Sequence, residues 1–160
     1  MPNWCANNVT LRHADPAMID RAANSKGLLM EFLPTPKDLL EGEGWYNWNI
    51  KNWGTKWDVD LENIERVDEN TLTAVFDSAW SPPIEAYNHM VEMGFEIEAH
   101  YYEPGIAFFG TYTGAGDEVF EDTIDFSSMD AETIRTEFPE ADERWNISEW
   151  LEECHAGQEE

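Results

Sequence analysis

One short stretch of the sequence, residues 53–58, combines aromatic rings with a cation and a carboxylate, which is the chemistry of a ligand pocket. It reads Trp-Gly-Thr-Lys-Trp-Asp. Tryptophans can stack on a planar ligand, and a lysine between them can bind a phosphate or a carboxylate. The alternative is structural: the lysine pairs with Asp58 or another acid while the tryptophans fill the core. The candidate pocket residues are Trp53, Lys56, Trp57, Asp58 and Trp80.

A second group of side chains with chemical potential lies on an expected strand. Glu98, His100 and Tyr102 alternate along it, so their side chains point to one side of a sheet. A metal site or an acid–base set would need such a group, but a strand histidine beside a carboxylate is more often a satisfied polar pair. Because His100 lies within a run of acids, we expect its protonated form to be favoured.

No arrangement typical of an enzyme can be recognised in the sequence. Cys5 and Cys154 lie near opposite ends of the chain, without a partner at metal-site spacing. Residues 110–116 contain three glycines but lack the Lys-Ser/Thr ending of a phosphate-binding loop. Pairs of neighbouring carboxylates are expected by chance in a chain with 34 acidic residues, so they do not indicate the two catalytic carboxylates of a glycosidase. We therefore expect a non-enzymatic protein with no cofactor and no metal ion, in a reducing compartment.

The composition is strongly acidic, and the charge is unevenly distributed. Against 34 Asp and Glu the chain has 9 Lys and Arg, a formal net charge of −25. Residues 1–66 hold ten acidic and seven basic residues, whereas residues 67–160 hold 24 and two. No Lys or Arg occurs between Arg66 and Arg135. Such a surface repels a phosphate backbone, so direct binding of nucleic acid is excluded.

The acidic half of the chain predicts a surface that attracts a basic partner. A strong negative field speeds association with basic proteins, and carboxylates at phosphate-like density can stand in for DNA on a protein that grips DNA. The alternative is that the charge serves solubility or adaptation to high salt. The predicted partner-binding residues are Glu96, Glu98, Glu103, Asp117, Glu118, Glu121, Asp122 and Asp125.

The elements that must position these side chains are those of an α+β protein. Alternating or apolar patterns predict strands over residues 7–12, 58–64, 70–78, 95–102, 106–113 and 118–125. Caps and helical spacing predict helices over residues 15–24, 83–93, 130–137 and 146–153. Residues 28–33 are ambiguous, and residues 41–57 indicate an ordered loop or irregular helix. Clustered strands favour an antiparallel sheet with helices packed on one face.

We expect the chain to form one domain with a tail. Residues 1–126 are predicted to form the α+β domain, and residues 127–160 an acidic helical extension packed on the same domain. No stretch reaches the roughly 18 to 20 apolar residues of a membrane-spanning helix, and the first residues are too polar for a secretory signal. We therefore expect a soluble, intracellular protein that does not engage a membrane.

Four motifs, in this order, resemble a known family. They are Met1-Pro2-Asn3-Trp4-Cys5-Ala6-Asn7, Trp53-Gly54-Thr55-Lys56-Trp57-Asp58, Phe76-Asp77-Ser78-Ala79-Trp80-Ser81-Pro82-Pro83 and Tyr102-Glu103-Pro104-Gly105-Ile106-Ala107-Phe108-Phe109-Gly110. They are similar to the YubB-type ferredoxin-like domain family of plasmids, phages and prophages. The resemblance covers residues 1 to about 126 and implies a ferredoxin-like α+β sandwich in the cytoplasm of a bacterial host. It carries over no catalytic residue, because the family has no established activity.

Charge and resemblance together predict an accessory protein of a mobile element. We expect it to bind a basic, DNA-handling host or rival protein through its acidic surface. The most specific form of this hypothesis is a DNA mimic that inhibits a restriction or CRISPR-type nuclease. The alternative is a small-molecule or nucleotide-binding domain that uses the tryptophans between positions 53 and 80 together with Lys56.

The charge also predicts the oligomeric state. Like-charge repulsion opposes self-association, so we expect a monomer, or a dimer that forms only when salt screens the charge. Light scattering at two salt concentrations measures this. A dimer that is stable at low salt would contradict the expectation.

Overall fold

The computed structural model describes residues 3–158 of the chain, with side chains as far as residue 154. The strands are β1 (Trp4–Arg12), β2 (Glu62–Asp68), β3 (Thr71–Ala79), β4 (Glu96–Glu103), β5 (Phe108–Ala115) and β6 (Glu118–Asp125). The helices are α1 (Pro16–Ala23), α2 (Leu28–Phe32), α3 (Lys37–Leu40), α4 (Gly44–Trp53), α5 (Ile84–Glu92), α6 (Ala131–Glu137), α7 (Pro139–Trp145) and α8 (Ile147–Gln158).

Strand β1 is the centre of a single antiparallel sheet. Its side chains alternate between buried and more exposed positions, and Cys5, Asn7, Val9 and Leu11 are the buried ones. It pairs with β3 on one side and β4 on the other, within the strand order β2-β3-β1-β4-β5-β6 of the described residues. The first four strands and their helices follow the β-α-β-β-α-β order of a ferredoxin-like fold. The predicted fold class is therefore confirmed, and β5 and β6 extend the sheet beyond it.

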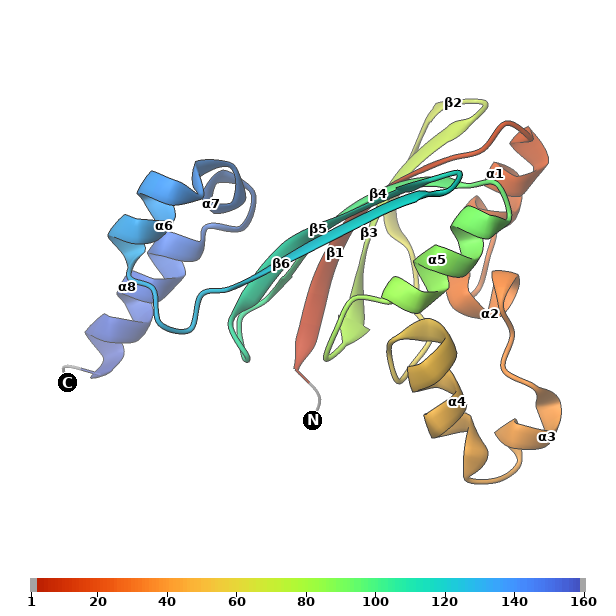
Figure 1. Cartoon of the computed structure of the whole chain (residues 1–160), viewed down its shortest axis with the longest axis horizontal. Helices are drawn as coiled ribbons and strands as arrows, with labels where there is room; N and C mark the ends of the chain where they lie inside the picture. The colour runs from red at the N-terminus through yellow and green to blue at the C-terminus, as the bar shows by residue number, and fades with distance from the viewer. Residues whose placement is uncertain (1–2, 159–160) are drawn as a thin grey trace.

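Helices α1–α5 cover one face of the sheet and build the main core (Figure 1). Helix α5 was predicted from its spacing of apolar residues, and it buries Tyr87, Met90 and Val91 against the sheet. Gly94 follows it with φ +100°, a left-handed conformation that glycine adopts without a steric penalty. The strand that returns from this turn packs its predicted apolar face, which includes Ile97 and Tyr101, into the same core.

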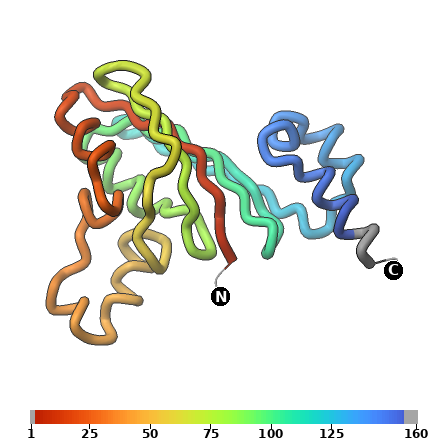
Figure 2. The backbone as a smooth tube through the Cα atoms, turned by 180° about the vertical axis from the view of Figure 1, so that it is seen from behind, coloured from red at the N-terminus to blue at the C-terminus, as the bar shows by residue number. Residues whose placement is uncertain are grey.

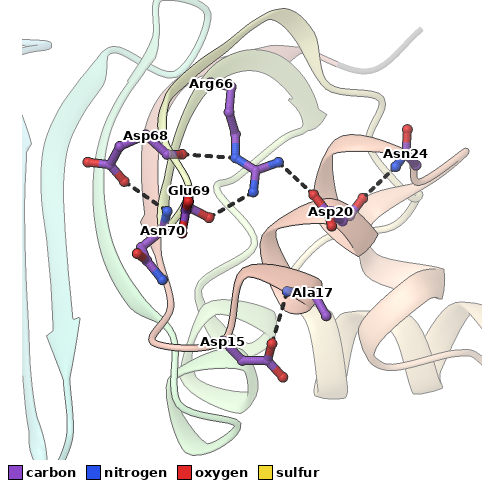
Figure 3. Close-up of polar contacts among 8 residues, drawn as sticks. All are labelled: Asp15, Ala17, Asp20, Asn24, Arg66, Asp68, Glu69 and Asn70. Carbon is purple, nitrogen blue, oxygen red and sulfur yellow. Dashed lines mark hydrogen bonds and ion pairs between the residues drawn. The ribbon is translucent and has the colours of Figure 1, made fainter.

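The other edge of this unit is tied to α1 by polar contacts. Asp15 is the N-cap of α1, as its sequence predicts, and its carboxylate accepts a hydrogen bond from the Ala17 amide at 3.0 Å (Figure 3). The Arg66 guanidinium on β2 forms an ion pair with Asp20 on α1 at 2.7 Å. It also donates to the Glu69 carbonyl at 2.7 Å, so one side chain joins the β2–β3 hairpin to the helix.

Helices α6–α8 lie on the opposite side of the sheet from α1–α5, at one end (Figure 1; Figure 2). They enclose a second hydrophobic core of Phe109, Phe126, Ile134, Ile147 and Leu151, in which Phe109 comes from β5. Alternation along β5 turns Phe109 to this face and Tyr112 to the main core. The C-terminal helices thus pack on the sheet but cover only part of its second face.

Two elements differ from the sequence-based expectation. Helix α7 was not expected, because Pro139 was interpreted as a break between helices. It occupies the first turn of α7, where its missing N–H costs no hydrogen bond. The strand expected at residues 58–64 is β2, shifted toward the C-terminus. Residues 44–53 form helix α4, so of the two alternatives for residues 41–57 the structure shows the helix.

The close contact between β5 and β6 predicts a sensitive position. A Cβ atom on Gly110 would overlap the Asp122 carbonyl oxygen of β6 and the Tyr101 hydroxyl. We expect Gly110→Ala to lower the free energy of unfolding by about 1–3 kcal/mol, as overpacking does. Gly42→Ala is the control, because a Cβ atom there meets nothing within 4 Å. Urea denaturation of both variants tests this, and equal stabilities would contradict it.

Candidate functional site

The structure divides the predicted acidic residues between the two sides of the sheet. Glu96 and Glu98 on β4 alternate with buried Ile97 and Ala99, so they face away from α1–α5. On β6, Asp122 pairs with Thr111 and points to the same open side, whereas Glu121 pairs with Tyr112 of the main core. The strand alternation thus separates them. Glu96, Glu98, Glu118 and Asp122 share the open side, Glu121 and Asp125 lie on the other, and Asp117 lies in the β5–β6 turn.

Glu103 does not belong to the exposed acidic surface, so its prediction as a partner-binding residue is wrong. Its side chain is 1 % exposed. The carboxylate accepts hydrogen bonds from the Gly105 amide at 2.6 Å and the Ile106 amide at 2.7 Å. It therefore closes the β4–β5 turn. The alternation of β4 explains the burial, because Glu103 follows Tyr101 on the core side of the strand.

Two residues of the predicted ligand pocket are structural. Trp53 is 2 % exposed, and its indole N–H donates to the Leu33 carbonyl at 2.8 Å. The Asp58 carboxylate accepts hydrogen bonds from the Leu29 amide at 2.7 Å and the Met30 amide at 3.2 Å, at the start of α2. Burial raises the pKa of Asp58, and these backbone hydrogen bonds oppose the rise. Neither side chain is available as a pocket wall, which corrects this part of the prediction.

Lys56 and Trp57 form a surface cation–π pair. The Lys56 ammonium lies 4.5 Å from the centroid of the Trp57 ring and 5.7 Å from that of Tyr46. The Trp4 ring also contacts Trp57, with ring centroids 6.0 Å apart. Among the described residues, no carboxylate lies within ion-pair distance of Lys56, so the expected pairing with Asp58 is absent. Trp80 is exposed and has a positive φ of 72°.

A cleft that was not predicted lies between the open side of the sheet and α7. Its volume is about 420 Å³. The sheet contributes His100, Thr111 and Asp122, and the helical side contributes the rings of Phe138 and Trp145. The remaining charged groups are Glu137 at the end of α6 and Glu140 and Arg144 on α7. The cleft is therefore mixed in character, with aromatic walls and charges of both signs.

His100 lines this cleft, and the direction of its pKa shift differs from the expectation. Its Nε2 is 3.4 Å from a Glu98 carboxylate oxygen, and its Nδ1 is 3.4 Å from the Thr111 hydroxyl. Burial and the Arg144 guanidinium lower the pKa of His100, while Glu98 and Glu140 oppose this effect. The expectation of a favoured protonated form was therefore wrong. Arg144 was not predicted as a site residue. Its one signal in the sequence is that it is one of only two Lys or Arg residues in positions 67–160.

The part of the chain that the structure describes has neither a metal-binding cluster nor a membrane-spanning helix. No group of three or more His, Cys, Asp or Glu residues there is placed to hold a metal ion. No helix of that part is long and apolar enough to cross a membrane.

The topology defines a ferredoxin-like α+β protein with an extended sheet, and comparisons identify its family. The family model described as "Ferredoxin-like domain in Api92-like protein" matches residues 53–144, more than half of the chain, so the chain belongs to this family. The match crosses the predicted domain boundary at residue 126 and includes α6 and most of α7.

One solved structure gives a further likeness. The chain is similar to the crystal structure of a protein api92 from Yersinia pseudotuberculosis, with 20% sequence identity and a TM-score of 0.45. The match covers 59% of this chain and 39% of that chain, so this chain spans well under half of that protein's length. No curated protein matches the sequence.

The environment of His100 predicts its titration. We expect a pKa below 6.5 in the folded protein and a higher pKa in the Arg144→Gln variant, because one of the two largest causes of the shift is removed. Since the unfolded chain then takes up this proton first, the stability due to His100 falls as the pH drops from 6.5 to the folded-state pKa. NMR titration of the imidazole measures both values.

The control is Arg135→Gln, because Arg135 pairs with Glu152 on α8. This substitution should leave the His100 titration as it is in the wild type. An unchanged His100 pKa in Arg144→Gln would show that Arg144 does not act on the histidine.

Proposed function

We propose that this chain is a non-enzymatic protein that binds a basic protein partner through the exposed carboxylates of the β4–β6 half of the sheet. The observation that carries the proposal is the charge of β6. Its charged residues are Glu118, Glu121, Asp122 and Asp125, all of them acidic and exposed. Within the described residues, none of the four forms an ion pair.

The physical basis is an uncompensated field. No Lys or Arg lies between positions 66 and 135, so segments adjacent in sequence supply no cation to β6. Arg12 and Arg144 line hollows together with Glu118 and Asp122, but among the described residues neither forms an ion pair with β6. A Lys- or Arg-rich partner would be steered to this surface and would relieve the repulsion among its carboxylates. Binding of this kind weakens as salt rises, because the charges are at the surface.

A partner that normally grips DNA is the most specific form of the proposal. Carboxylates on both sides of one strand present acceptor oxygens to the lysines and arginines that would otherwise contact phosphates. In this form, the protein is an accessory protein of a phage or plasmid, related to the YubB-type family. It inhibits a restriction or CRISPR-type nuclease in the cytoplasm of a bacterial host.

An alternative function is the binding of a small planar anion at Lys56. The observation in its favour is that the Lys56 ammonium lies over the Trp57 ring with no carboxylate partner among the described residues. Burial of Trp53 and the capping role of Asp58 leave Lys56, Trp57 and the exposed Trp80 of the predicted pocket, and Tyr46 lies beside Lys56. Loss of binding in Trp57→Ala with the acidic surface intact would favour it.

The proposal predicts the behaviour of a charge-reversed variant. We expect the wild type to retain one basic DNA-handling protein from a bacterial lysate at about 0.15 M salt, and duplex DNA to displace it. The variant with Glu118→Lys, Glu121→Lys and Asp122→Lys should lose at least about tenfold in affinity, because the field is reversed at the contact. Affinity capture with mass spectrometry, followed by titration with the captured protein, measures this.

The control variant carries Asp38→Lys, Glu41→Lys and Glu43→Lys, the same change in net charge at exposed positions outside the β4–β6 half. It should retain the partner. If both variants bind a salt-sensitive mixture of basic proteins equally, the charge is generic and the proposal is wrong.

A further inference from the structure

We propose that the free edge of β6 binds an extended, basic segment of the partner as a seventh strand of the sheet. This inference rests on the proposed function and specifies how the contact is made. Strand addition depends on backbone hydrogen bonds as well as on charge, so it can be tested separately from the charge-based binding of the proposed function.

Strand β6 is a regular edge strand. All eight of its residues pair with β5 in one unbroken register, from Phe108 opposite Asp125 to Ala115 opposite Glu118. In the described part of the chain it is the last strand of the sheet, and no element pairs with its outer side. Such an edge presents a row of unpaired N–H and C=O groups.

The ladder shows which backbone groups are free. The Phe126 amide donates to the Ala107 carbonyl at 2.9 Å, and hydrogen-bonded pairs alternate along an antiparallel ladder. The backbone groups of Phe120 and Asp122 therefore point toward β5, which agrees with the approach of the Asp122 carbonyl to Gly110. The outward-pointing groups belong to the other half of the strand: Val119, Glu121, Thr123 and Asp125.

The opposite edge strand of the sheet, β2, is protected against pairing with a further strand, whereas β6 is not. Strand β2 pairs with β3 through two register shifts, and Asn63 has a positive φ of 50°. Irregularities of this kind twist an edge away from further pairing. Its Arg66 is in addition held by the ion pair to Asp20. Strand β6 has neither device.

The side chains of β6 select the chemistry of the added strand. Carboxylates lie on both sides of the strand, and two apolar side chains between them are exposed, Val119 by 50 % and Phe120 by 61 %. A second copy of β6 would bring like charges together across the new pair, which is destabilising. A strand with lysine or arginine at alternate positions instead gains cross-strand ion pairs and can stack on Phe120.

A hollow beside the strand accommodates such a side chain. It measures about 500 Å³, and its lining includes four carboxylates, the aromatic residue Phe120 and one cation, Arg12. An arginine or lysine entering it would find carboxylates and an aromatic ring in one place, and these carboxylates outnumber the single Arg12 guanidinium. The geometry therefore favours a partner segment that combines strand propensity with positive charge, and charge complementarity is the reason for choosing it over a second copy.

The test uses the full chain and a synthetic peptide in which lysine alternates with valine and threonine, matched to the eight residues of β6. We expect the peptide to slow amide hydrogen exchange at Glu121 and Thr123, whose N–H groups point outward. NMR spectra of the labelled protein report the exchange and the affinity. The same peptide with N-methyl groups on alternate residues keeps the charge but cannot pair along an edge, and should bind at least about tenfold more weakly.

Variants of β6 provide the matching evidence from the protein side. Glu121→Pro removes one outward N–H without removing a hydrogen bond to β5, and should abolish the slowed exchange. Glu121→Gln removes the same charge and keeps the N–H, so it should weaken peptide binding in a salt-dependent way and retain the protection. If the proline variant fails to fold, the N-methylated peptide still decides the question.

Each remaining outcome overturns a defined part. Equal binding of both peptides would overturn strand addition and leave the proposed binding of basic partners standing. No binding of either peptide at low salt would overturn both. Concentration-dependent protection of β6 without any peptide would show that the edge is occupied by a second copy of the chain, which overturns the basic partner as its occupant.

Discussion

The fold depends on the hydrogen bonds of Asn7, a polar residue buried at the centre of the sheet. Its amide nitrogen donates to the Ser78 hydroxyl on β3 at 2.9 Å, and its amide oxygen accepts from the Tyr87 hydroxyl on α5 at 3.3 Å. An unsatisfied buried polar group costs about 1–3 kcal/mol, so this network penalises other arrangements. A shift of one residue in the register of β1 would turn Asn7 to the opposite face. Asn7 therefore links the central strand, its neighbour and the main helix in one register.

The features with functional potential lie in the part of the molecule that the ferredoxin-like unit does not need. Strands β1–β4 and their helices complete that topology by themselves. Strands β5 and β6 and helices α6–α8 add a second core, the cleft at His100 and an open edge. Because none of the residues of β6 is fully buried in either core, this outermost strand can expose charge.

The two edges of the sheet show how the chain manages unpaired backbone groups. Strand β2 is irregular and mixed in charge, whereas β6 is regular and its charged residues are all acidic. Repulsion between like carboxylates discourages pairing of β6 with its own copies, which is a known way of protecting an edge. The same charge leaves the edge receptive to a basic strand, so protection from self-association and selection of a partner arise from one physical property.

The sequence by itself determined the elements whose signals are local. The Asp15-Pro16 cap defines the start of α1, period-two alternation defines β4, and residues 118–125 coincide with β6. The burial of Glu103 also follows from the alternation of β4 and could have been predicted. These features depend on neighbours a few residues apart, so caps and strand period are sufficient to identify them.

Only the tertiary structure decided which distant residues meet. Helices α6–α8 pack on the second face of the sheet and bring Arg144 to His100. Burial of the imidazole, together with this cation, reverses the expected direction of its pKa shift. Trp53 is buried while Trp57 is exposed, although both are tryptophans in one short stretch. A tryptophan is compatible with either a buried or an exposed position, so the residue type alone does not predict which one it takes. The choice is made by packing between segments far apart in the chain, which no local pattern encodes.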